Sequence, residues 1–143
     1  MPWVELGYLT SGAELTELSD SDLDTGGYAD QSSIRELPGR SGRSFSALLR
    51  GEDSLGAMLE ASGHASVPSP SNPGPGGNEY YNGHYSTIQY GSLGGGTISG
   101  VQVECPREAR VDADARQALA ESIAGSLLEY LAVVYGADFR ESR

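Results

Sequence analysis

Apolar and polar side chains alternate strictly in the segment Val-Gln-Val-Glu-Cys-Pro-Arg at positions 101–107. Its two valines and the cysteine fall on one face, whereas Gln102 and Glu104 fall on the other. A period of two is typical of a β-strand that is buried on one side. The proline ends the strand because it has no N–H to donate to a neighbouring strand. The pattern predicts a core strand that carries Glu104 near its end, where α/β folds often place their chemistry.

Two other segments, at positions 3–9 and 65–67, have the character of strands. The stretch 69–77, Ser-Pro-Ser-Asn-Pro-Gly-Pro-Gly-Gly, cannot form regular structure and predicts a loop. Three successive glycines, Gly94–Gly96, predict a turn directly before the strand that carries Glu104.

The first half of the chain shows helical spacing in short pieces. Positions 32–37 and 44–49 each predict a short helix, and Pro38-Gly39 is expected to stop the first of them. Asp53 is placed to cap a further helix that Gly63 would close.

The acidic stretch 11–30 carries Asp20, Asp22 and Asp24 at alternate positions. Such spacing occurs in calcium loops, but the glycine and the bidentate glutamate of those loops are missing at the required offsets. We therefore expect a helix start or a solvated loop there.

The clearest element is a long helix near the C-terminus. Asp112 is a good N-cap, Asp114 adds negative charge to the first turn, and Gly136 is placed to end the helix in a left-handed conformation. Apolar residues at three- and four-residue spacing predict one buried stripe that packs on the sheet. The stripe comprises Leu119, Ile123, Leu127, Leu131 and Val134.

Composition narrows the range of partners. The 143 residues suggest one domain, 1–143, with nine arginines, no lysine and a formal net charge of -11. Nucleic acids and anionic membranes attract clustered cations, so we expect neither as a partner. No run approaches the roughly 18 apolar residues of a membrane helix, and the first residues lack the features of a signal peptide, so a cytoplasmic location is expected.

Few residues offer catalytic chemistry. Glu104 could act as a general base on water. His64 and His84 have no ligand partner three or four residues away, so the sequence itself contains no zinc motif. The single Cys105 excludes an internal disulfide, and we expect it to be a small core residue. Gly-x-Ser-x-Gly, Gly-x-Gly-x-x-Gly and phosphate-loop patterns are absent from the sequence.

Several short motifs together resemble the C-terminal half of N-formylglutamate amidohydrolase-like proteins. In that family a Gly-Tyr-Ile/Asn-Thr-Arg segment and a Tyr-Gly or His-Gly pair precede a Gln-(Ile/Leu)-Glu strand, and a long helix closes the domain. The matching segments here are Gly83–Thr87, Tyr90–Ser92 and Val101–Arg107, with weaker similarity at Trp3–Tyr8 and Leu48–Gly56.

The resemblance implies an α/β fold like that of zinc carboxypeptidases, a partial mixed sheet flanked by helices and ending in a long amphipathic helix. It implies that Glu104 is the general base on a zinc-bound water. Tyr85, Thr87, Gln89 and Gln102 would then bind an N-acyl amino acid or a peptide-like substrate. The family's zinc ligands lie upstream of what matches Trp3–Tyr8, so zinc is expected as the cofactor but its ligands are not found in this chain.

Two positions depart from the family pattern. Ile88 and Gln89 stand where relatives often carry arginine, whose planar fork grips a substrate carboxylate. His84 stands where relatives usually have glycine, so the local turn is expected to differ.

Three interpretations remain open at this point. The chain is a hydrolase whose metal ligands come from a longer form or a second chain. Alternatively, it is a non-catalytic remnant that binds a ligand or a protein through Tyr80, Tyr81, Tyr85 and Tyr90. In the third interpretation it is a poorly folded fragment with an exposed sheet edge, through which it would self-associate.

Overall fold

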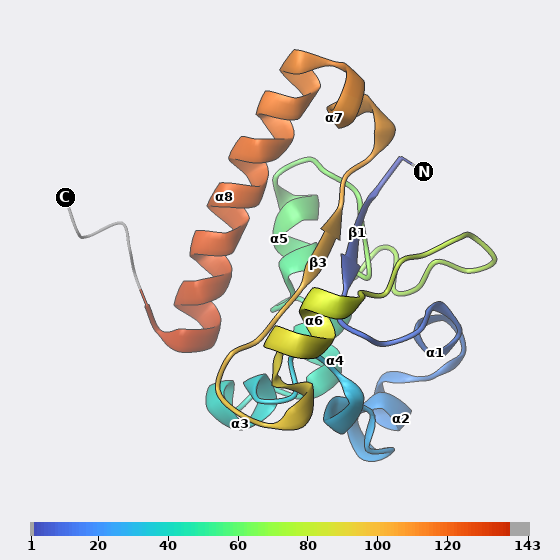
Figure 1. Cartoon of the computed structure of the whole chain (residues 1–143), viewed down its shortest axis with the longest axis vertical. Coiled ribbons are helices and arrows are strands. Elements are labelled where there is room, and N and C mark those ends of the chain that lie inside the picture. Colours follow the sequence, from blue (N-terminus) through green and yellow to red (C-terminus); the bar gives the residue numbers. More distant parts are fainter. Residues whose placement is uncertain (1, 138–143) are drawn as a thin grey trace.

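A small mixed sheet organises the chain in the computed structural model, which describes residues 2–137 (Figure 1). Its three strands, in the order β2-β1-β3, are β1 (Val4–Gly7), β2 (Ser66–Val67) and β3 (Gln102–Glu104). The central strand β1 is parallel to β2 and antiparallel to β3. The prediction of a core strand at 101–105 is therefore wrong in one respect: β3 is half-buried and lies at an edge of the described sheet.

Helices surround the sheet and close the chain, which confirms a mixed α/β architecture that ends in a long helix. The α-helices are α1 (Gly12–Glu17), α2 (Asp20–Thr25), α3 (Leu37–Ser41), α4 (Phe45–Arg50), α5 (Leu55–Ala61), α6 (Tyr85–Tyr90), α7 (Arg107–Val111) and α8 (Ala113–Tyr135). Two 3-10 helices, η1 (Tyr28–Gln31) and η2 (Ser92–Gly94), complete the described elements.

Serine caps explain why the polar N-terminal region is helical. Ser11 and Ser19 each form a capping box. The serine side chain accepts the backbone N–H of an acidic residue three positions later, and the side chain of that residue accepts the backbone N–H of the serine. The acidic stretch 11–30 thus contains α1 and α2. Ser54, one residue after the expected Asp53, caps α5.

The helix predicted at 32–37 is wrong. Residues 33–36 form turns, and α3 begins at Leu37 with Pro38 in its first turn. Proline is tolerated there because the first N–H groups of a helix have no intrahelical partner. Pro38 therefore starts a helix instead of stopping one.

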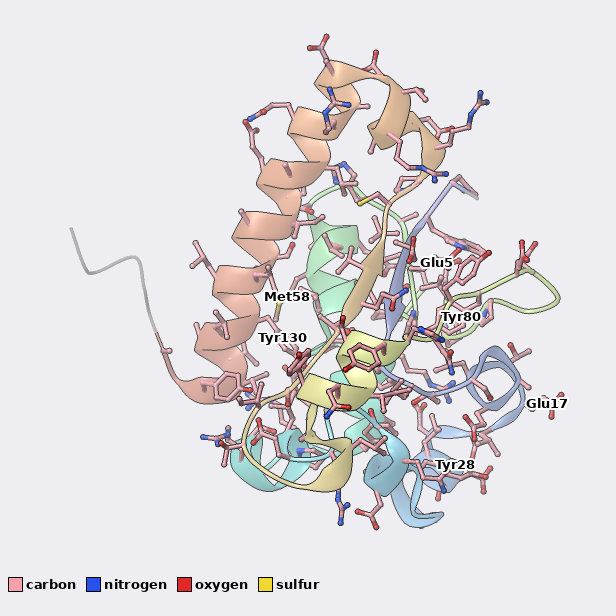
Figure 2. The ribbon with its side chains drawn as sticks, in the orientation of Figure 1. Glu5, Glu17, Tyr28, Met58, Tyr80 and Tyr130 are labelled. Atoms are coloured by element: carbon pink, nitrogen blue, oxygen red, sulfur yellow. The ribbon has the colours of Figure 1, made fainter. Side chains whose placement is uncertain are left out.

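Different elements pack against the two faces of the sheet. Leu6 and Val103 are register partners on one face, where Leu6 belongs to the hydrophobic core and the partly buried Val103 packs against it. The long helix α8 packs against α5, α3 and α7, and Figure 1 shows α5 and α8 on the same side of the sheet. Met58 of α5 and Tyr130 of α8 lie on the side of α8 that faces the sheet (Figure 2). The loop that precedes α6 runs along the opposite side of β1, and this side carries the candidate site.

The caps of α8 are as predicted, but its buried stripe is rotated. Asp112 accepts the N–H of Ala115 at 2.7 Å, and Gly136 ends the helix with φ of 64°. Leu127 is 37 % exposed, so its place in the predicted stripe is wrong. The buried positions of α8 are Leu119, Ser126, Tyr130 and Val134.

The exposed face of α8 carries apolar as well as charged side chains. By length and composition α8 is the one described helix that could cross a membrane; 22% of its most apolar 18 residues are buried, and a single such helix is weak evidence for a membrane span. Leu128 and Tyr135 lie exposed on this helix.

Candidate functional site

Glu104 lies in a cleft of about 270 Å³ between the strands β1 and β3, the loop before α6, and α7. We call it the β1–β3 cleft. Its lining comprises Trp3, Glu5, Glu79, Tyr81, Glu104, Cys105, Pro106, Arg107 and Arg110.

Two carboxylates face each other across the strands at this cleft. Glu5 and Glu104 are register partners in the antiparallel β1–β3 pair, so their side chains emerge on the same face of the sheet. The Cβ atoms of such partners lie roughly 4.5–5.5 Å apart. Like charges in this arrangement repel, and sheets that tolerate them need compensating contacts.

Each carboxylate has one compensating hydrogen bond. Glu5, only 6% exposed, accepts the backbone N–H of Tyr81 on Oε2 at 3.0 Å. Glu104 accepts the side-chain amide of Gln102 on Oε1 at 2.8 Å. The other oxygen of each carboxylate makes no hydrogen bond within residues 2–137. The cleft therefore holds two carboxylate oxygens with free acceptor capacity.

The Tyr81 N–H reaches Glu5 because the loop is bound tightly to β1. The Tyr80 hydroxyl donates to the carbonyl of Leu6 at 2.7 Å, and the Leu9 N–H donates to Asn82 O at 2.6 Å. A Cβ atom at Gly7 would lie 2.5 Å from the Asn82 carbonyl carbon, so only glycine permits this approach. Figure 2 shows Tyr80 beside β1, on the side of this loop.

Burial keeps the Tyr80 hydroxyl protonated. Desolvation raises the pKa of Tyr80 far above the usual phenol value, and the nearby charge of Glu5 raises it further. The hydroxyl therefore remains a hydrogen-bond donor to Leu6 throughout the neutral range.

The cleft also contains two cationic side chains. Arg107 and Arg110 lie three residues apart on α7, and both are exposed at the rim. Within the described part of the chain neither forms an ion pair with an acidic side chain. Their charge is thus available to a ligand.

The structure unites two of the predicted site residues and separates the other three from them. Gln102 orients Glu104 through its amide. Tyr85, Thr87 and Gln89 lie on α6, outside the cleft lining. Thr87 is buried and donates its hydroxyl to His84 O at 2.7 Å, whereas Tyr85 is 64% exposed.

Sequence reasoning missed most of the cleft. Glu5 sits between Val4 and Leu6, and this alternation was the available signal that it shares a face with other polar strand residues. No local pattern indicated the contributions of Tyr81 or Arg110. Cys105 is exposed at the cleft rim, so the expectation of a core cysteine is wrong.

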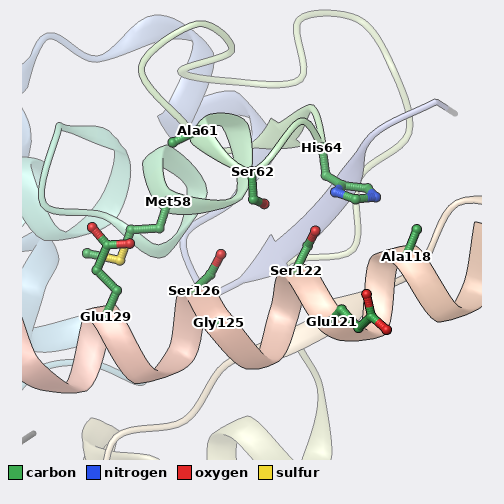
Figure 3. A pocket seen from close by; sticks show the side chains of 10 residues that line it. All are labelled: Met58, Ala61, Ser62, His64, Ala118, Glu121, Ser122, Gly125, Ser126 and Glu129. Atoms are coloured by element: carbon green, nitrogen blue, oxygen red, sulfur yellow. The ribbon is translucent and has the colours of Figure 1, made fainter. Parts of the chain in front are cut away.

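Neither histidine takes part in this cleft. His64 lines an open groove of about 570 Å³ between α5 and α8, together with Ser122, Ser126 and Glu129 (Figure 3). Its Nδ1 is buried and has no hydrogen-bond partner among the described residues. Residues 2–137 contain no group of three or more His, Cys, Asp or Glu side chains arranged to hold a metal ion. The described residues thus offer no site that fits the zinc implied by the family resemblance.

Comparison with known proteins identifies no family for this chain. No family model, no curated protein and no solved structure matches the chain.

Proposed function

We propose that the chain hydrolyses the amide bond of a small N-acyl amino acid, with Glu104 as the general base. The observation that carries this proposal is the position of Glu104 in the β1–β3 cleft, oriented by Gln102 and opposite the buried Glu5. The resemblance to N-formylglutamate amidohydrolase-like proteins supports the same role and a zinc carboxypeptidase-like ancestry. A volume of about 270 Å³ suits a small substrate.

The hydrogen bond from Gln102 gives the two Glu104 carboxylate oxygens different roles. Oε1 is held by the amide, which leaves Oε2 to accept a proton from water in the cleft. The resulting hydroxide attacks the amide carbon, and the protonated Glu104 can return the proton to the departing nitrogen. Glu5 keeps its position through the Tyr81 N–H and limits where an anionic group can lie.

Zinc would polarise the substrate carbonyl if it were bound. No set of three zinc ligands occurs among residues 2–137. The resemblance also assigns substrate binding to Tyr85, Thr87 and Gln89, and this assignment stays a proposal.

The test is a hydrolysis assay on a panel of N-acyl amino acids, with zinc measured per chain in the same purified sample. The native protein should release the free amino acid. Glu104→Gln should lower kcat by about 100-fold or more, because general-base catalysis contributes at least that much. Glu79→Gln is the matched control, since Glu79 lines the same cleft but makes no hydrogen bond to Glu104.

Equal kcat values for the native protein and the Glu104→Gln variant would exclude Glu104 as the base. Absence of any turnover in the folded native protein, with and without added zinc, would overturn the hydrolase proposal as a whole. Circular dichroism and urea unfolding of each variant show that a loss of rate is not a loss of fold.

An exposed aromatic surface supports a second candidate, a non-catalytic binding module. Tyr85 and Tyr90 on α6 are 64% and 66% exposed, and Ile88 between them is 49% exposed. Aromatic and apolar side chains of this kind are enriched at binding sites. Under this hypothesis Tyr85→Ser with Tyr90→Ser should abolish ligand or protein binding while Glu104→Gln leaves it intact; the reverse pattern would exclude it.

A further inference from the structure

The open groove between α5 and α8, which we call the α5–α8 groove, shares no lining residue with the β1–β3 cleft. Its volume is about 570 Å³. Figure 3 shows Ser122 and Ser126 of α8 pointing toward α5, with Glu129 toward one end of the groove and His64 toward the other. Amide hydrolysis in the β1–β3 cleft leaves this groove without a role.

The Ser126 hydroxyl is a polar group in the groove that the fold leaves unpaired. Ser126 is 3% exposed, yet its hydroxyl forms no hydrogen bond within residues 2–137. Helical hydroxyls often donate to the carbonyl four residues earlier, as those of Thr16, Thr25 and Ser41 do. A buried polar group without a partner costs free energy, so a ligand that hydrogen-bonds to Ser126 would recover that cost.

Gly125 leaves space beside the α8 backbone in the same groove. Glycine in the interior of a helix lowers its stability relative to alanine. Among the described residues nothing lies within 4 Å of the position that a Cβ atom at Gly125 would take, so packing within the chain does not require glycine. Its effect is to let an occupant of the groove approach the α8 backbone closely.

The charges along the groove favour a cation. Its lining contains Glu121 and Glu129 and no arginine, and neither glutamate forms an ion pair within the described part of the chain. Glu121 accepts one hydrogen bond, from the Gln117 amide at 2.7 Å. Because the two glutamates are eight positions apart on α8, their Cα atoms are separated by roughly 12 Å along the helix axis.

We propose that the α5–α8 groove binds a linear aliphatic polyamine. The terminal ammonium groups pair with Glu121 and Glu129, an inner ammonium group donates to the Ser126 hydroxyl, and the methylene chain lies along Gly125 and Met58. Ammonium groups donate hydrogen bonds and accept none, which matches a lining that offers carboxylate and hydroxyl oxygens as acceptors. The proposal is independent of the hydrolysis proposed for the β1–β3 cleft.

Titration calorimetry of the native protein at about 0.15 M salt tests the proposal, because this salt concentration screens weak attraction to the acidic surface. The triamine spermidine should bind with a dissociation constant of about 0.1–1 mM. The shorter 1,4-diaminobutane cannot reach both glutamates and should bind about fivefold more weakly, because one ion pair is lost.

Removal of the two carboxylates, Glu121→Gln with Glu129→Gln, should weaken spermidine binding by about tenfold. The matched control is Glu17→Gln with Glu52→Gln, which changes the net charge equally at exposed positions outside the groove and should alter the affinity by less than about twofold.

A second comparison isolates the Ser126 hydroxyl. Ser126→Ala should weaken spermidine binding by about tenfold, since a hydrogen bond to a charged donor is lost. The same variant should bind 1,8-diaminooctane as the native protein does, because this diamine has terminal ammonium groups but no inner nitrogen.

Gly125→Leu fills the groove without removing any polar group. The variant should keep or raise the urea midpoint, because leucine favours a helix more than glycine does and the Cβ position is open. Its side chain occupies the groove and should abolish spermidine binding. Gly125→Ala, which adds a single methyl group, replaces it if the leucine variant does not fold.

The proposal is overturned if the native protein shows no saturable binding of spermidine, or if the folded Glu121 and Glu129 variant binds it as tightly as the native protein. An equal loss in the Glu17 and Glu52 control also overturns it, because the polyamine would then be attracted to the acidic surface in general. Undiminished binding to the folded Gly125→Leu variant would place the ligand elsewhere and has the same consequence.

Discussion

At the scale of single residues, Glu5 decides how the β1–β3 cleft can work. A carboxylate that is only 6% exposed loses most of its hydration, and it is tolerated only where hydrogen bonds replace that hydration. The Tyr81 N–H supplies one such bond, and Glu5 has the charge of Glu104 opposite it. The loop before α6 is thus part of the site, because it carries the donor that holds Glu5 in place.

Two buried tyrosines provide a matched test of what a hydroxyl contributes here. The Tyr80 hydroxyl donates to Leu6 O, whereas the hydroxyl of Tyr8, which is 2% exposed, has no partner within residues 2–137. Tyr80→Phe should lower the free energy of unfolding by about 1–3 kcal/mol, since it leaves the Leu6 carbonyl without its partner. Tyr8→Phe should keep or raise it, because it removes a buried polar group that makes no bond. Urea unfolding measures both, and equal losses in the two variants would contradict this account.

At the scale of elements, α8 shows which part of a helix pattern is informative. Its caps, Asp112 and Gly136, are local signals, and both were predicted correctly. Its buried face was predicted with an error in rotation, because leucines and alanines occur around much of the helix. Ser126, a polar residue, is 3% exposed, whereas Leu127 is 37% exposed. Packing against α5 decides the buried face, and the α8 sequence does not contain that information.

Truncation of two leucines tests this assignment of faces. Leu119→Ala should lower the free energy of unfolding by about 2–5 kcal/mol, because Leu119 is 3% exposed and leaves a cavity. Leu127→Ala should lower it by less than about 1 kcal/mol, since that side chain is already partly in water and alanine favours the helix. Urea midpoints of the two variants provide the comparison. A larger loss at Leu127 would mean that its face is covered in solution.

The same distinction explains which parts of the fold and the site were predictable. The strand at 3–9, the helices near 44–49 and 54–61, and the pairing of Gln102 with Glu104 on one face follow from short-range patterns. The edge position of β3 depends on pairing between strands, which a period of two does not specify. The hydrogen bond between Tyr81 and Glu5 joins residues 76 positions apart, so no local motif could indicate it.

At the scale of the whole molecule, the core contains several phenols that must stay uncharged. Burial raises the pKa values of Tyr8, Tyr80 and Tyr130. The neighbouring tyrosines raise the pKa of Tyr8 further, and the charge of Glu5 raises that of Tyr80 further. The three residues come from β1's C-terminal end, from the loop before α6 and from α8. Ionisation of any of them would therefore disturb the packing of the sheet against α8 or against the loop before α6.

This arrangement predicts unfolding at alkaline pH with a definite sign. Below about pH 10 the phenols are protonated in both the folded and the unfolded chain, so their contribution to stability is complete. Above that value the unfolded chain loses these protons and the folded chain keeps them, so stability falls as the pH rises toward the raised folded-state pKa values. Each phenol contributes up to about 1.4 kcal/mol per pH unit, and the three together up to about 4 kcal/mol per pH unit.

Urea unfolding across this pH range, followed by circular dichroism, measures the slope, and absorbance of tyrosinate at the same pH values reports ionisation. Ionisation of the buried phenols should coincide with unfolding, and Tyr80→Phe with Tyr130→Phe should reduce the slope by about two thirds, because two of the three linked protons are removed. If the stability of the native protein is unchanged well above pH 10, these phenols are not held in a water-free core. The burial of Tyr80, which joins the loop before α6 to β1, would then be contradicted.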